Sequence, residues 1–399
     1  MSGLSGRSSI ALILALTAAR CRSRMVYSRS ATMAATRSAP TRSARSTRHR
    51  AGVAAGAGTP LRTRRGSGRV TLLDVARQAG VSAQTVSRVL NMPEQVPPTT
   101  VARIREAISA VGYVPNLLAG GLASGRSRLV AALVPTIVGP VFLETIEALT
   151  RTLGARGYQL MLGESGYDDS DEAELLQNLI SRRPDGIILT RIVQSPEARE
   201  RLVAARIPVV ETWDLTADPV DMLIGFSHAD AGAAVADFFA ARGSRRPALL
   251  TGDDPRAARR RDGYAARLAR HGLLRSAAQL PSVQVRAPAP LGAGRTSFAR
   301  LIEQSPKIDA IFCSTDYIAF GAIIEARERG IRVPEDVAIV GFGDLSIARD
   351  TAPALTTVRI DGTEIGRCAA EWVMQRAERR TTLRPQRDIG FSLIRRASA

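Results

Sequence analysis

Short apolar runs alternate with segments of helical periodicity from residue 128 to the end of the chain, and this alternation restricts the possible folds more than any other feature. One helical segment carries Phe142, Ile146, Leu149 and Leu153 on one face, as expected for a helix that packs on a sheet. The runs predicted as parallel strands are 129–134, 159–162, 186–189, 208–210, 248–251, 310–313 and 337–340. Strands and helices in alternation predict a doubly wound α/β fold.

A different pattern, that of two short helices, occupies residues 70–91. Thr71 is followed three residues later by Asp74, which is the spacing of a capping box and predicts a helix over 72–79. Gly80 is placed to end this helix in the left-handed conformation. A second helix follows over 83–90, so the segment is predicted to form a helix-turn-helix.

Ser82 is the predicted cap of the second helix, and a third helix is predicted over 98–111, with Pro98 in its first turn. The three helices share enough apolar residues for a small core. Those expected to pack between the first two helices are Leu73, Val75, Ala76, Val81, Val86, Val89 and Leu90.

The second helix presents a polar strip on its outer face. Its residues are Ala83, Gln84, Ser87, Arg88 and Asn91, the types that reach base edges and phosphates from the major groove. A three-helix bundle with a purely structural role would show the same spacing. The polar strip favours DNA binding over that alternative.

Charge is distributed unevenly along the 399 residues. The formal net charge is +18, but residues 1–69 hold 14 arginines and no acidic residue, so the remainder carries only +4. The bulk charge therefore says little about the partners of the folded part. Of the 55 basic residues only Lys307 is a lysine, and we attach no function to that bias.

The first 69 residues contain an apolar run at 10–19, preceded by Arg7, that is similar to a short signal peptide. It is too short to span a membrane. The Ser, Thr, Ala, Gly and Arg mixture that follows has no hydrophobic period and favours a disordered basic tail, or a start site assigned too far upstream. We expect a cytoplasmic protein without a membrane partner.

Cysteine and histidine are too scattered to suggest a metal site or a disulfide framework. Cys21, Cys313 and Cys368 lie far apart and form no CxxC pair. No metalloprotease, nucleophile-elbow or P-loop motif is present. The sequence thus predicts no metal, no cofactor and no enzymatic activity.

Two stretches carry a family resemblance: VTLLDVARQAGVSAQTVSRVLN at 70–91 and VGYVPNLLAGGLASG at 111–125. They resemble the headpiece and hinge of the lactose-repressor/galactose-repressor family, and the similarity extends to about residue 394. The resemblance implies an all-α helix-turn-helix headpiece and hinge helix, then a two-lobed core of doubly wound parallel sheets like a periplasmic sugar-binding protein. It also implies a homodimer that binds double-stranded DNA at a palindromic operator.

The resemblance implies a role for each DNA-binding residue. Ala83, Gln84 and Arg88 would face bases, whereas Thr71, Ser82, Thr85, Ser87 and Asn91 would hold phosphates. Tyr113 and Asn116 belong to the Tyr-x-Pro-Asn step, and a hinge helix at 116–123 would insert Leu122 into the minor groove. Gly120 and Gly121 depart from the family's usual hinge residues and disfavour a helix, which fits either a hinge that folds only on DNA or a slack linker.

Three segments are expected along the chain: a tail at 1–69, the headpiece and hinge at 70–127, and the effector-binding and dimerisation core at 128–399. The family resemblance implies that the core divides into two lobes, each built from two stretches of the chain. The first lobe would comprise 129–226 plus 334–362, and the second 227–333 plus 363–399.

Polar residues just beyond the carboxyl ends of strands are the candidates for an effector site. Asp214, Arg260 and Asp316 occupy such positions, although each could be a cap or a solvated surface residue. The family's cleft arginine precedes a Gly-aromatic pair, as Arg260 does, and its cleft aspartate follows Thr or Asn, as Asp316 does. Phe142 matches a wall of the cleft or could be core. Ala289 replaces an aromatic lid, which argues against a planar ligand.

Residues 91–96, 158–190 and 207–214 look most like gluconate-operon repressors. The resemblance implies gluconate or another sugar acid as effector, with Arg260 binding its carboxylate and Asp214 and Asp316 its hydroxyls. A different aldonate or a neutral sugar stays open. So does a secreted sugar-binding protein, which would explain the core but leave the headpiece without a purpose.

Overall fold

The computed structural model describes residues 70–114, 126–167 and 172–399. The basic tail, the hinge with Asn116, Gly120, Gly121 and Leu122, and the segment 168–171 lie outside the described residues. In the part that is described, no helix is both long and apolar enough to cross a membrane.

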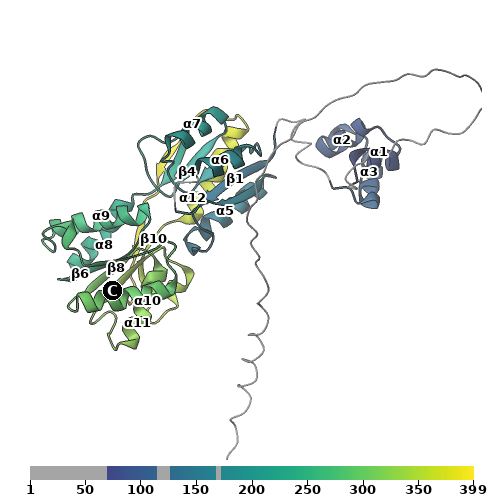
Figure 1. Cartoon of the computed structure of the whole chain (residues 1–399). Coiled ribbons are helices and arrows are strands. Elements are labelled where there is room, and N and C mark those ends of the chain that lie inside the picture. Colours follow the sequence, from purple (N-terminus) through teal and green to yellow (C-terminus); the bar gives the residue numbers. More distant parts are fainter. Residues whose placement is uncertain (1–69, 115–125, 168–171) are drawn as a thin grey trace, which may run out of the picture. The chain divides into compact units, whose positions relative to one another are not determined.

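The headpiece consists of three helices, α1 (Leu72–Ala79), α2 (Ala83–Asn91) and α3 (Pro98–Val111), with a short 3-10 turn at Pro93–Gln95 (Figure 1). The predicted helix bounds are confirmed to within one residue. The Asp74 carboxylate accepts hydrogen bonds from the Thr71 amide at 2.9 Å and from the Thr71 hydroxyl at 2.7 Å. Gly80 ends α1 with φ of 64°, the left-handed conformation expected there.

A small apolar core holds the headpiece helices together. Val75 and Val86 are fully buried at the contact of α1 with α2, and Ile104 is the fully buried contribution of α3. Leu73 was expected in this core, but its exposed fraction is 63%. Leu73 lies about 200° around α1 from the fully buried Val75, so its side chain points away from that residue.

The first lobe of the core contains a six-stranded sheet, here sheet A, in the order β11-β5-β4-β3-β1-β2. All five pairings in it are parallel. Its strands are β1 (Leu129–Val134), β2 (Gln159–Glu164), β3 (Gly186–Leu189), β4 (Val209–Thr212), β5 (Met222–Gly225) and β11 (Gln386–Asp388). Its helices are α5 (Leu143–Gly154), α6 (Glu172–Ile180), α7 (Pro196–Ala205) and α12 (Gly362–Ala377).

The second lobe contains sheet B, in the order β12-β10-β9-β8-β6-β7. Four pairings are parallel, and the edge strand β12 is antiparallel to β10. Its strands are β6 (Pro247–Gly252), β7 (Ser282–Val285), β8 (Ala310–Cys313), β9 (Ala338–Phe342), β10 (Thr356–Arg359) and β12 (Ser392–Ile394). Its helices are α8 (His228–Arg242), α9 (Pro255–Arg270), α10 (Leu291–Gln304) and α11 (Asp316–Glu328).

The expected division of the core into lobes was wrong in its C-terminal part. Strands β9 and β10, within 334–362, pair in sheet B and not in sheet A. Conversely, α12 packs against α5, and β11 pairs with β5 in sheet A. The chain therefore crosses between the lobes three times, after β5, after β10 and after β11, as Figure 1 shows by the yellow α12 among the teal elements of the first lobe.

All seven predicted strands are present, some longer by one or two residues, and the α/β class is confirmed. Five further strands, β5, β7, β10, β11 and β12, were not predicted. The last two have only three residues each, and β11 is exposed throughout, so an apolar run could not reveal them. Phe142, Leu149 and Leu153 are buried as expected, and Ile146 is partly buried.

Candidate effector site and DNA-binding surface

Two neighbouring cavities lie where the carboxyl ends of strands from both lobes meet. One, of about 230 Å³, is lined by Tyr167, Arg191 and Asp214 of the first lobe and by Arg256 and Arg259 of the second. The other, of about 50 Å³, shares Tyr167 and Arg256 with it. Its further lining residues are Val141, Phe142, Trp213, His228, Asp254, Arg260, Ser314, Thr315 and Phe342. This location is where parallel sheets generally hold ligands.

Arg260 is a buried cation on α9 whose terminal nitrogens already have partners. Nη1 donates to His228 Nδ1 at 2.9 Å, Nη2 donates to the Ser314 carbonyl at 3.2 Å, and the guanidinium stacks 4.1 Å from the centre of the Phe342 ring. Burial lowers the pKa of Arg260 to about 10, so it stays charged at neutral pH. Its Nε is buried and has no hydrogen-bond partner within 70–114, 126–167 and 172–399.

His228 connects Arg260 to the first lobe. Its Nε2 lies 2.9 Å from the Trp213 carbonyl, which can only accept, while Arg260 can only donate to Nδ1. These partners require the neutral imidazole with its proton on Nε2. Burial, and then the charge of Arg260, hold the pKa of His228 well below its usual value, which agrees with the neutral form.

Arg256 and Arg259 are the two other α9 cations that face the first lobe. Arg256 donates to the Thr190 carbonyl at 3.0 Å and lies 5.1 Å from the centre of the Phe142 ring. Arg259 forms an ion pair with Asp214. Both arginines therefore contact side chains or backbone across the cleft, and neither was singled out from the sequence, although both lie in the arginine-rich segment around Arg260.

The sequence-predicted effector residues do not meet in one place. Asp214 lines the larger cavity, whereas Arg260 and Phe142 line the smaller one. Asp316 lines neither, because its carboxylate is buried in sheet B. It accepts hydrogen bonds from the Thr357 hydroxyl at 2.6 Å and from the Leu345 amide at 2.8 Å. Burial raises the pKa of Asp316 to about 6.

Aromatic residues form the wall of the smaller cavity. Phe142 is 3% exposed and packs edge-on against Trp213, with ring centres 4.9 Å apart. Phe142 is thus both core and cavity wall. Tyr167, Trp213, His228 and Phe342 were not predicted from the sequence, because each is isolated among unrelated residues and only the fold brings them together. Ala289 packs against the second-lobe core.

The residues expected at DNA lie on one side of α2 and at the helix starts. Gln84, Arg88 and Asn91 are exposed, and Ala83, Thr85 and Ser87 are partly exposed. The exposed Ser82 caps α2 by accepting from the Thr85 amide at 3.2 Å. Thr71 is exposed at the start of α1, whereas Tyr113 packs partly against the headpiece core.

No group of three or more His, Cys, Asp and Glu side chains within 70–114, 126–167 and 172–399 is arranged to hold a metal ion. Of the charged side chains that line the two cavities, four are arginines and two are aspartates. Such a set can bind an anion by charge and by forked hydrogen bonds.

Comparison with known proteins gives these features a context. Residues 71–116 match the family described as bacterial regulatory proteins, lacI family, and residues 236–399 match a periplasmic binding protein-like domain. The HTH-type transcriptional regulator GntR of Pseudomonas aeruginosa is 35% identical over 337 residues, covering 84% of this chain and 97% of that protein. The chain belongs to the lacI family.

Other regulators are similar to this chain over most of their length. The HTH-type transcriptional regulator IdnR of Escherichia coli is 30% identical over 82% of this chain and 97% of its own. A lacI-family regulator from Silicibacter pomeroyi has the same fold, with a TM-score of 0.76, 32% identity and coverage of 82% of this chain and 99% of that one. The lac repressor dimer bound to operator gives a TM-score of 0.70 at 25% identity, covering 83% and 99%.

As a member of the lacI family, the chain is a DNA-binding transcriptional regulator of the repressor type. The relatives are regulators, not enzymes, which agrees with the missing catalytic motifs. The secreted sugar-binding interpretation is not favoured, because the similarity includes the complete headpiece.

Proposed function

We propose that this repressor binds a palindromic operator as a homodimer in the cytoplasm and is released from it by gluconate or a closely related sugar acid. The observation that carries the proposal is the set of cationic side chains on α9, Arg256, Arg259 and Arg260, at two cavities that both lobes line. A ligand with a carboxylate would complement these charges.

The proposed ligand would bridge the lobes. Its carboxylate would bind Arg256, which lines both cavities and has donors beyond the one used by Thr190. Its hydroxyls would donate to Asp214, and Arg260, with its buried Nε, would contribute from the smaller cavity. Asp316 would reach the ligand only by losing its hydrogen bond with Thr357 or with Leu345. We therefore propose that Asp316 has a structural role in the second lobe.

A ligand changes operator affinity only if it binds one arrangement of the lobes better than another. The contacts of Arg256 with Thr190 and of Arg259 with Asp214 cross between the lobes. A sugar acid that enters this set would exchange those contacts for its own and favour one lobe arrangement. We propose that this shift weakens the hinge contact with DNA.

The proposed reading of DNA uses the exposed strip of α2. Arg88 and Gln84 would contact base edges, with Ala83 against them, and Thr71, Ser82, Thr85, Ser87 and Asn91 would hold phosphates. Tyr113, Asn116 and Leu122 would complete the contact at the hinge.

Calorimetry of the full chain with gluconate and with glucose tests the proposal. We expect gluconate to bind and glucose not to, and gluconate to release a selected operator. Arg256→Gln should weaken gluconate binding by about 10-fold or more, since it removes a charge-assisted hydrogen bond. Arg261→Gln is the matched control, because Arg261 lies on the same helix and pairs with its neighbour Asp262.

Equal binding of glucose and gluconate would replace the sugar acid by a neutral sugar. Failure of every aldonate and sugar to bind would contradict the effector proposal while leaving the repressor identity in place. An Arg256→Gln protein that responds like wild type would remove Arg256 from the site.

A further inference from the structure

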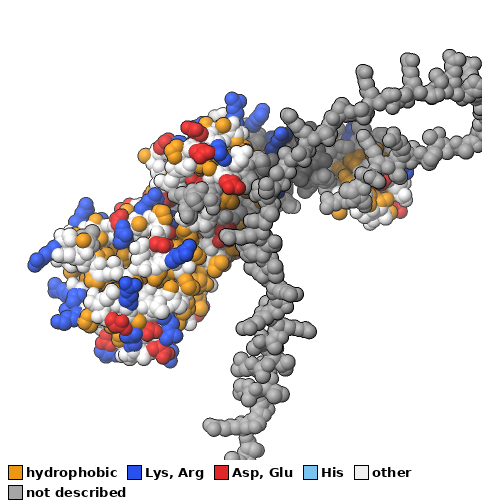
Figure 2. Space-filling view, in the orientation of Figure 1, with side chains coloured by type: hydrophobic (Ala, Val, Ile, Leu, Met, Phe, Trp, Pro, Cys, Tyr) orange, Lys and Arg blue, Asp and Glu red, His pale blue; other side chains and the backbone are white. Residues whose placement is uncertain are grey.

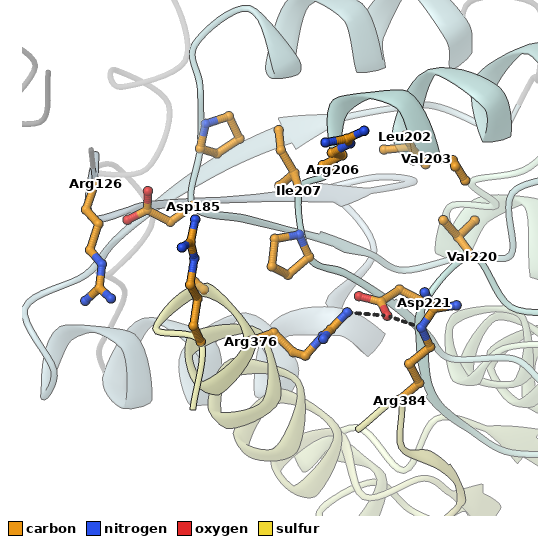
Figure 3. Close-up of a pocket in the computed structure, with 14 residues that line it drawn as sticks. Arg126, Asp185, Leu202, Val203, Arg206, Ile207, Val220, Asp221, Arg376 and Arg384 are labelled. Atoms are coloured by element: carbon orange, nitrogen blue, oxygen red, sulfur yellow. Dashed lines mark hydrogen bonds and ion pairs between the residues drawn. The ribbon is translucent and has the colours of Figure 1, made fainter. Parts of the chain in front are cut away.

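A large hollow lies at the end of sheet A opposite the effector cavities. Its volume is about 850 Å³. Arg126 precedes β1, Asp185 precedes β3, Pro208 precedes β4 and Asp221 precedes β5, and all four line it (Figure 3). Because these strands are parallel, their amino ends share one edge of the sheet, while the effector cavities lie at their carboxyl ends.

Basic side chains dominate this hollow. It is lined by five arginines and two carboxylates, with Leu202, Val203, Ile207 and Val220 supplying apolar surface (Figure 3). The arginines are Arg126, Arg206, Arg376, Arg379 and Arg384. All of them except Arg376 are exposed residues. Five positive and two negative charges leave a formal charge of +3 in one concave surface.

The two carboxylates are already engaged. Asp221 pairs with Arg376 at 3.2 Å and with Arg384 at 3.4 Å, as the dashed lines in Figure 3 show. Asp185 accepts hydrogen bonds from the backbone amides of Ser127 at 2.9 Å and Arg128 at 2.8 Å. The buried Nε of Arg376 has no hydrogen-bond partner among the described residues. The hollow thus keeps a surplus of cationic donors.

Asp185 also shows that the hollow lies next to the backbone that follows the segment 115–125. Its bonds to Ser127 and Arg128 hold the backbone at the first residues described after the segment 115–125. Arg126 is four residues from Leu122, and four extended residues span at most about 14 Å. A duplex carries one phosphate charge per about 1.7 Å of its axis, so phosphates lie within that reach of any DNA contact made by Leu122.

We propose that this hollow binds phosphate groups of the operator backbone beside the hinge. The inference rests on the proposed function, because it needs the hinge at DNA. Arginine forks suit phosphate oxygens, and the contact would be independent of base sequence. The first lobe would therefore add affinity for the duplex on its own account, beyond what the headpiece supplies.

The salt dependence of DNA binding tests this site. The full-length variant Arg206→Gln/Arg379→Gln should bind its selected operator and a duplex of mixed sequence more weakly by similar factors. Each lost phosphate contact lowers the slope of log affinity against log salt by about 0.9, so a dimer that loses two to four contacts should lose roughly 2 to 4 in slope. The matched control is Arg245→Gln/Arg300→Gln, the same charge change at exposed positions of the second lobe.

The measurements separate the possible failures. A hollow variant whose slope equals that of the control, with an unchanged thermal unfolding midpoint, overturns the proposal. Calorimetry with inorganic phosphate in the absence of DNA is a second experiment. Suppose that phosphate binds saturably, that the hollow variant loses this binding, and that the salt slope of DNA binding is unchanged. The ligand would then be a free phosphate compound, and the proposal that the hollow binds operator phosphates would be overturned. A wild type that does not prefer any operator would instead refute the proposed function.

Discussion

The headpiece and the effector cleft build their sites in opposite ways. The headpiece needs only residues 70–114, and its candidate DNA-binding side chains, such as Gln84 and Arg88, are exposed. The cleft draws on residues from Pro135 to Phe342, and several of its side chains already form hydrogen bonds across the lobes. A site made of exposed, local residues can be altered without unfolding its support, whereas a cleft residue is part of the packing.

The largest expected effect tests the independence of the headpiece. Ile104→Ala removes a fully buried side chain from its small core and should lower the free energy of headpiece unfolding by about 2–5 kcal/mol. Operator binding should be lost, while the core keeps its thermal transition. Leu301→Ala, in the second lobe, is the converse control. Calorimetric scans in which each substitution shifts both transitions would show that the two regions are not separate.

Asp316 should make the stability of the core depend on pH. Its pKa is about 6 in the folded chain and near 3.8 when unfolded, so the native state binds more protons between these values. This group therefore lowers the free energy of unfolding as pH rises from about 4 to 6, by at most about 3 kcal/mol. Unfolding of wild type and Asp316→Asn at several pH values should differ in slope in that window, and parallel curves would contradict the assignment.

Arg88→Ala tests whether an exposed headpiece residue carries specificity alone. If Arg88 contacts a guanine, its loss should cost about 1–3 kcal/mol of specific binding and leave the headpiece folded. Competition between the selected operator and mixed-sequence DNA measures this directly. Undiminished discrimination by the variant would remove Arg88 from base reading, and gluconate binding should be unaffected either way.

The smallest expected effect is the loss of a helix N-cap, which can be compared between the headpiece and the core. Ser82 accepts from the Thr85 amide at the start of α2, and Ser227 accepts from the Asp230 amide at the start of α8. Replacing either by Ala should cost about 1 kcal/mol. We expect Ser82→Ala to shift only the headpiece transition and Ser227→Ala only the core transition in thermal unfolding. A shift of the other transition would show energetic coupling between the regions.

The sequence by itself determined the headpiece almost completely. Its helices, the Asp74 cap, the Gly80 turn and the polar strip of α2 depend on residues within a few positions of one another, and local hydrogen bonds decide such features. It also determined the α/β class and seven strands of the core, six of which are buried, and buried parallel strands are apolar throughout. Leu73 shows the limit, since its outward direction depends on which face of α1 meets α3.

Only the tertiary structure decided which lobe each C-terminal segment joins and which polar residues share a cavity. α12 and β9 both carry apolar residues that fit either sheet. The packing of α12 on α5 places α12 in the first lobe, and the pairing of β9 with β8 places β9 in the second. Arg259, not Arg260, pairs with Asp214, because neighbouring helix positions point in directions about 100° apart. The Asp316 carboxylate accepts a hydrogen bond from the Thr357 hydroxyl, which lies on a distant strand. Spacing along the chain gives the presence of such groups, but their partners follow from the packing of distant elements.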